Sequence, residues 1–134
     1  PDSGSAKRYL RLAQLVEPGG AGNFTEDSLY GQIDVEAAIQ ILRDTKDPIT
    51  GQVYTLGASI NLDIIGNNAV FHSMVFEPGT GNFWLAAGIP DGLTAEEILS
   101  SLNPRGNLNP YVGFNLFDMV DGASPGDSGV PIYP

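Results

Sequence analysis

A pair of apolar segments joined by a Pro-Gly turn constrains the fold of this chain more than any other feature. Residues 69–76 and 82–87 are rich in aromatic and branched side chains, and residues 77–81 separate them with the sequence Glu-Pro-Gly-Thr-Gly. Two such runs around a turn predict a β-hairpin. Because both faces of each predicted strand are mostly apolar, we expect the hairpin to lie inside a layered fold.

Three segments have apolar residues at helical spacing. The first covers residues 5–17, and the second covers residues 35–44 after Asp34, a residue type that favours the N-cap position. The third, residues 94–102, begins with a capping box at Thr94. Together with the hairpin, these helices predict an α+β fold.

The remaining segments have weaker signals. Residues 47–51 contain Asp, Pro and Gly and predict a turn. Short extended segments are expected at residues 52–56, 59–65 and 111–119. Residues 120–134 contain many small and polar residues, and we interpret them as a flexible tail.

Composition excludes several classes of function. The 134 residues include sixteen acidic and only six basic side chains, for a net charge of −10. Without a basic patch, nucleic-acid binding is not expected. No apolar run approaches the roughly 20 residues of a membrane span, so we expect no membrane partner. The absence of cysteine does not fix the compartment, although we favour an extracellular or periplasmic location.

Few residues are candidates for chemistry. Asn67 and Asn68 stand just before the hairpin, where side-chain amides could hold an oxyanion or orient a substrate carbonyl, although asparagine also favours turns. His72, the only histidine, is a candidate substrate contact, although a lone His in an apolar strand is more often packed in the core. It has no second His and no Cys beside which to bind metal, so we expect neither a metal nor a cofactor.

The acidic residues around the second predicted helix have a simpler interpretation. Asp34 and Glu36 suit the positive end of its dipole, and Asp44 and Asp47 follow its end. We therefore expect solvated structural roles for all four. Ser128 lies in a Gly-Asp-Ser-Gly stretch like that of serine proteases, but it stands six residues from the end, with Val130 in place of the second glycine. We reject that match.

The order of several short motifs resembles the C-terminal part of the isopenicillin-N acyltransferase-like family. In residues 66–88 an Asn-Asn pair precedes His-Ser-Met-Val-Phe-Glu-Pro and then Phe-Trp-Leu-Ala-Ala. Residues 33–44 end in Leu-Arg-Asp like the preceding helix of that family, and residues 8–16 resemble an earlier helix. Residues 110–114 resemble its closing strand. The similarity covers roughly residues 6–117.

This resemblance implies membership of the N-terminal nucleophile hydrolases, which have an αββα sandwich and mature by autocatalytic cleavage. In this family the new N-terminal Cys serves as nucleophile and base, whereas this chain has no Cys. The nucleophile would then lie outside it. The family also often has an active-site Arg before the hairpin, but no Arg stands between Arg43 and Arg105.

The sequence thus leads to two alternatives. In the first, residues 1–134 are a single C-terminal segment or processed subunit of a larger domain, and Pro1 marks a processing site or an artificial boundary. The chain would belong to an amidase or acyltransferase that acts through an acyl-enzyme on a small acyl amide. Its partner would be another chain of the same precursor. Asn68 would hold the oxyanion or orient the substrate, and Asn67 and His72 would bind the substrate. In the second, the chain is a non-catalytic secreted binding or interaction domain.

Overall fold

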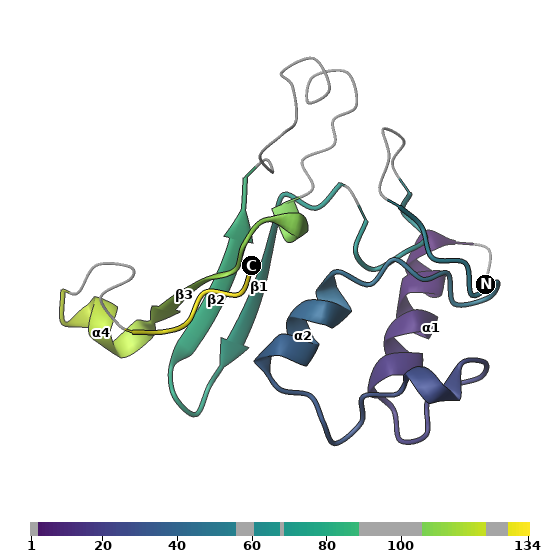
Figure 1. Cartoon of the computed structure of the whole chain (residues 1–134), viewed down its shortest axis with the longest axis horizontal. Coiled ribbons are helices and arrows are strands. Elements are labelled where there is room, and N and C mark those ends of the chain that lie inside the picture. Colours follow the sequence, from purple (N-terminus) through teal and green to yellow (C-terminus); the bar gives the residue numbers. More distant parts are fainter. Residues whose placement is uncertain (1–2, 56–60, 68, 89–105, 123–128) are drawn as a thin grey trace, which may run out of the picture.

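The computed structural model describes residues 3–55, 61–67, 69–88, 106–122 and 129–134. Figure 1 shows helix α2 between helix α1 and a three-stranded antiparallel sheet, with the short helix α4 at the far end of the sheet. The described residues therefore have an α+β arrangement, as predicted. The helix expected at residues 94–102 lies outside the described residues.

Helices α1 and α2 begin at the residues that the capping signals indicate. Helix α1 spans Gly4–Val16, and the Ala6 amide donates to the Ser3 hydroxyl. Helix α2 spans Val35–Leu42, and the Ala37 amide donates to the Asp34 carboxylate at 2.9 Å. Each cap satisfies a backbone donor that has no partner within the helix.

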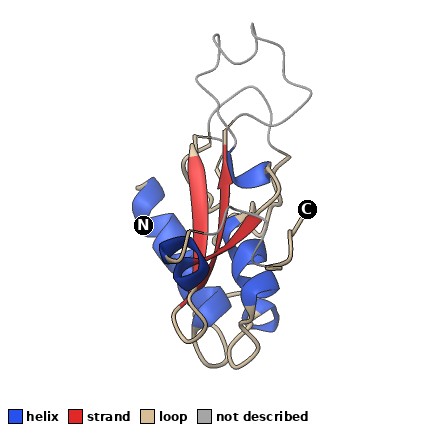
Figure 2. Cartoon of the chain, turned by 90° about the vertical axis from the view of Figure 1, so that its left-hand side faces the viewer, coloured by secondary structure: helices blue, strands red, loops and turns tan. Residues whose placement is uncertain are grey.

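The predicted hairpin is present. Strand β1 (His72–Glu77) pairs with β2 (Asn82–Ala87), and β2 pairs with β3 (Val112–Asn115), so the sheet order is β1-β2-β3. The Thr80 and Gly81 amides both donate to the Glu77 carbonyl and close the turn. Figure 2 shows the three strands side by side.

The core lies between one face of this sheet and helix α2. Its buried members are Ile39 of α2, Trp84 and Ala86 of β2, and Tyr111 just before β3. Partly buried apolar side chains pack around them: Val35, Leu42, Val75, Val130 and Tyr133. The apolar stripe of the second predicted helix therefore does face the sheet.

Two predicted extended segments differ from the structure. Within residues 59–65, the described residues 61–65 form turns, because the Asn61 side chain accepts a hydrogen bond from the Asp63 amide. Within residues 111–119, only Val112–Asn115 is a strand, and helix α4 (Leu116–Val120) follows it. The Asn115 side chain ends the strand by capping this helix, accepting from the Phe117 and Asp118 amides.

The expectation of a flexible tail is wrong for residues 129–134, which pack on the core face of the sheet. Tyr111 and Tyr133 form an isolated β-bridge, and the Trp84 indole donates to the Pro131 carbonyl at 3.0 Å. Tyr133 also meets Trp84 edge to face, with ring centroids 6.0 Å apart. These apolar and aromatic contacts outweigh the glycine and proline content that predicted a loose end. Ser128 lies outside the described residues.

Candidate functional site

The two faces of the sheet differ sharply. Along β1, Ser73 and Val75 point to the core, whereas His72, Met74 and Phe76 point the other way. The strand register extends this second face, which we call the open face, across the sheet. Its apolar members are Met74, Phe76, Phe83, Leu85, Val112 and Phe114.

The open face is apolar and accessible. Met74 and Phe76 expose 59% and 49% of their surface, and the Phe83 and Phe114 rings stack with centroids 5.0 Å apart. Helix α4, at the far end of the sheet (Figure 1), also exposes apolar side chains: Phe117 and Val120 are 61% and 79% exposed. We expected the hairpin to be covered on both faces. Among the described residues, helix α2 covers the core face, and the open face has no comparable layer.

Asn67 occupies a turn, and its side chain is engaged there. Its amide group donates to the Ile64 and Ile65 carbonyls at 3.4 and 3.3 Å, and its oxygen accepts from the Ala69 amide at 3.1 Å. Asn67 also lines a hollow between α1 and α2. Asn68, the predicted oxyanion contact, lies outside the described residues.

His72 is exposed at the start of β1, so packing in the core is ruled out for it. Its imidazole has no hydrogen-bond or ion-pair partner among the residues that the structure describes. Asn67 and His72 border different surfaces, because the hollow that Asn67 lines lies between the helices and His72 lies on the open face of the sheet.

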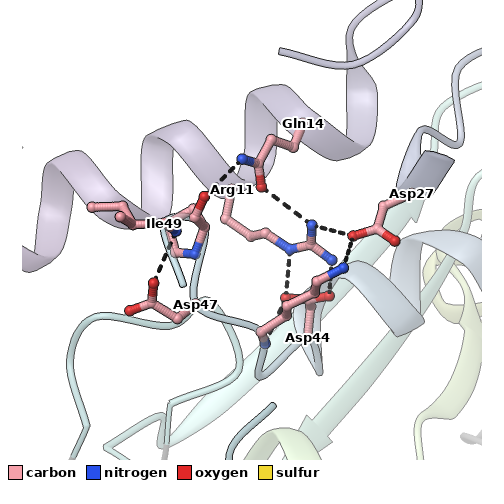
Figure 3. Close-up of polar contacts among 8 residues, drawn as sticks. Arg11, Gln14, Asp27, Asp44, Asp47 and Ile49 are labelled. Carbon is pink, nitrogen blue, oxygen red and sulfur yellow. Dashed lines mark hydrogen bonds and ion pairs between the residues drawn. The ribbon is translucent and has the colours of Figure 1, made fainter. Parts of the chain in front are cut away.

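A buried ionic network centred on Arg11 is the most developed polar feature of the described residues (Figure 3). Arg11 is only 3% exposed, and its guanidinium donates twice to the Asp44 carboxylate, at 2.9 and 2.8 Å. It also donates to Asp27 of the 3₁₀ helix η1 (Thr25–Asp27) at 2.7 Å and to Gln14 at 3.2 Å. Lys46 pairs with the same Asp27 carboxylate. The network fastens η1 and the loop after α2 to helix α1.

The charges in this network stabilise one another. Burial lowers the pKa of Arg11, but the hydrogen bonds to Asp44 and Asp27 outweigh it and raise the pKa above its ordinary value. Burial likewise raises the pKa of Asp27, but the bonds from Lys46 and Arg11 bring it below the usual range. Because its donors are committed to these partners, we assign Arg11 a structural role.

Asp47 is also buried, so the expectation of a solvated role is wrong for it. Its carboxylate accepts from the Ile49 and Thr50 amides, both at 2.8 Å. Burial raises the pKa of Asp47, but these backbone bonds and the nearby Lys7 charge outweigh it and hold the pKa below its usual value. Figure 3 shows Asp47 on the loop below helix α1.

Arg43, at the end of α2, holds three distant segments together. Its guanidinium donates to the main-chain oxygens of Asn107, Asn109 and Pro134, at 2.8 to 2.9 Å. It also lies over the Tyr111 ring, 5.0 Å from the centroid. Asn107 belongs to the 3₁₀ helix η2 (Gly106–Leu108), which follows the undescribed residues 89–105.

Tyr111 is fully buried beside this guanidinium. Burial raises the pKa of its phenol, and the nearby Ser73 hydroxyl and Arg43 charge oppose that rise. The Tyr111 hydroxyl and the Asn107 side-chain oxygen have no partner of ordinary hydrogen-bond geometry within the described residues.

The sequence did not lead us to expect the buried network around Arg11 or the main-chain contacts of Arg43. The signal for Arg11 was present, because it stands four residues before Leu15 and shares its helix face with that apolar residue. Arg43 bonds to main-chain oxygens far away in sequence, and side-chain type alone does not reveal such bonds.

The described residues contain no cluster of three or more His, Asp or Glu side chains that could hold a metal ion. None of the described helices is both long and apolar enough to span a membrane. Comparison of the chain with protein-family models, with curated proteins and with solved structures found no match.

Proposed function

We propose that this chain forms the C-terminal part of an amide-bond hydrolase or acyltransferase whose nucleophile lies on another chain of the same precursor. The observation that carries this proposal is the sheet with α2 on one face and an open apolar face on the other. The fold implied by the resemblance, an αββα sandwich, is built from two such sheets with their inner faces together.

The exposed side chains support a second layer. Complete burial of a fully exposed Met or Phe side chain contributes roughly 1.5–3 kcal/mol. Because Met74 and Phe76 are still about half exposed, a second layer would gain part of that free energy from each of them. A sheet packs on a second sheet about 10 Å away by interdigitating side chains of this kind. The stacked pair of Phe83 and Phe114 would lie between the two sheets.

In the proposed reaction, the N-terminal residue of the partner chain acts as the nucleophile and its own α-amine acts as the base. The free α-amine of the partner's first residue takes the proton of that residue's thiol or hydroxyl, whose sulfur or oxygen attacks the acyl amide carbonyl. The tetrahedral intermediate then collapses, and the amine leaves with a proton. Water or a second amine finally removes the acyl group from the nucleophile.

The residues of this chain would border that reaction. His72 stands on the open face at the start of β1, and we assign it a contact with substrate in the space between the sheets. Asn68 would donate to the developing oxyanion, and Asn67 would position the loop through its bonds to neighbouring backbone.

The test begins with the protein isolated from its native host. We expect a second chain to co-purify, to begin with Cys, Ser or Thr, and to be encoded upstream in the same reading frame. Intact-mass measurement and N-terminal sequencing check this. The complex should release amine from a panel of N-acyl amides.

Variants then separate catalysis from scaffold. Asn68→Ala should lower kcat/KM by about 10²–10³ with little change in the urea midpoint, whereas Asn67→Ala should lower mainly the urea midpoint. His72→Ala should raise KM. Asn23→Ala, in a loop after α1, is the control and should leave both quantities unchanged. A single-chain protein without turnover would instead favour the non-catalytic interaction domain.

A further inference from the structure

A second surface feature lies between α1 and α2, apart from the open face. It is a hollow of about 350 Å³, a size within the range of small-molecule sites. Its walls are mostly apolar, with one cation and one amide: Arg8, Tyr9, Leu12, Ile41, Leu42, Ile65 and Asn67. Tyr9 and Leu12 are 73% and 41% exposed, so much of the apolar wall is accessible to solvent.

The cation of this hollow is unusual in so acidic a chain. Lys7, Arg11 and Lys46 each pair with at least one carboxylate. Arg8 instead donates to the Leu62 carbonyl and to the Ser5 hydroxyl, both neutral, and it forms no ion pair within the described part of the chain. A guanidinium carries five N–H donors, so Arg8 retains donors as well as an uncompensated positive charge.

We propose that this hollow binds a small monocarboxylate with an apolar tail. The tail would pack among Leu12, Ile41 and Leu42, and the carboxylate would accept hydrogen bonds from Arg8. Arg43 forms no ion pair among the described residues either, but its guanidinium donates to three main-chain oxygens. Arg8 is the basic side chain that lines this hollow, and its charge favours a carboxylate there. This inference does not depend on the proposed enzymatic function.

Octanoate and 1-octanol are suitable probes, because they share a tail length and differ in charge. Titration calorimetry is performed on the protein from its native host, with any chain that co-purifies, and on variants made in that host. We expect saturable binding of octanoate and weaker binding of octanol. Arg8→Gln should weaken octanoate about tenfold and leave octanol unchanged, because it removes a charge-assisted bond of roughly 1.5 kcal/mol.

A second pair of variants locates the site. Leu12→Trp, which fills the hollow, should abolish binding of both probes, whereas Val53→Trp adds the same bulk at an exposed position outside the hollow and should bind normally. Equal weakening of both probes by Arg8→Gln would overturn the carboxylate assignment. Unaltered binding in Leu12→Trp, or no saturable binding of octanoate to the unmodified protein, would overturn the site.

Discussion

At the scale of the residue, Arg11 is the side chain on which most local structure depends. Arg11→Met keeps roughly the length of the side chain but removes the ion pair of Asp44 and leaves Asp27 with Lys46 alone. Breaking a buried pair from one side costs about 3–5 kcal/mol, and we expect a loss in that range in the free energy of unfolding. Urea titration of the full chain measures it. Arg8→Met, which breaks no ion pair, should cost less than about 1 kcal/mol, and equal losses would contradict the structural role.

The buried carboxylate of Asp47 predicts a pH dependence. Because its pKa is lower in the folded chain than in the unfolded chain, ionised Asp47 adds stability above its unfolded value of about 3.9. That contribution is lost as pH falls through the lower folded value. In Asp47→Asn the stability should be lower at pH 7 and change less between pH 5 and pH 2. Urea midpoints across this range provide the measurement.

A neighbouring variant controls for damage to the turn. Ile49→Ala truncates an exposed side chain and leaves the Asp47 carboxylate and its backbone donors in place. It should retain the wild-type pH profile. A steep acid profile in Asp47→Asn equal to that of wild type would show that other groups govern acid unfolding.

Single residues also show where the sequence was informative. A turn role for Asn67 could be predicted, because its short amide side chain reaches its own backbone. The exposure of His72 could not, because an apolar strand does not reveal which of its faces is covered. The burial of Asp47 depends on the local turn, but also on helix α1 and Lys7, which lie far away in sequence.

At the scale of the element, the segment of residues 129–134 depends on a close approach at Gly113. A β-carbon on Gly113 would lie 2.3 Å from a Val130 methyl group, so Gly113→Ala must displace that segment. We expect a loss of about 1–3 kcal/mol in stability and loss of the bond from Trp84 to Pro131. Trp84 is the only tryptophan, so its fluorescence should shift to longer wavelength as the segment leaves.

Gly79, in the hairpin turn, is the matched control. A β-carbon there meets no atom within 4 Å, and Gly79→Ala should leave the Trp84 emission unchanged. If Gly113→Ala also left the emission unchanged, residues 129–134 would not pack on β3 as described.

Elements with local signals could be predicted, whereas those fixed by distant contacts could not. Helices α1 and α2 have their own caps, and the hairpin has its own turn. The end of β3 depends on one capping residue, Asn115, within a run that otherwise favours a strand. The segment of residues 129–134 is held by Trp84 and Arg43, and no local pattern records those contacts.

At the scale of the whole molecule, the sequence predicted that both faces of the hairpin have to be covered. It did not predict which elements cover each face. The apolar character of both hairpin faces is a property of residues 69–87 and could be recognised directly. Which face α2 covers depends on the packing of Ile39 against Trp84. In the proposed sandwich a partner chain would supply the second layer, so the proposal has to be tested through association.

Met74→Glu provides that test, because it places a charge on the open face without touching the core. Met74 is 59% exposed, so the variant chain should fold as stably as wild type and should be more soluble. Burial of an unpaired carboxylate between two sheets costs several kcal/mol, and association with the partner chain should therefore weaken at least about a hundredfold. Size-exclusion chromatography and intact-mass measurement of protein from the native host check this. Val53→Glu, at an exposed position outside the sheet, should leave association intact. Undiminished association in Met74→Glu would mean that the open face is not where the partner packs.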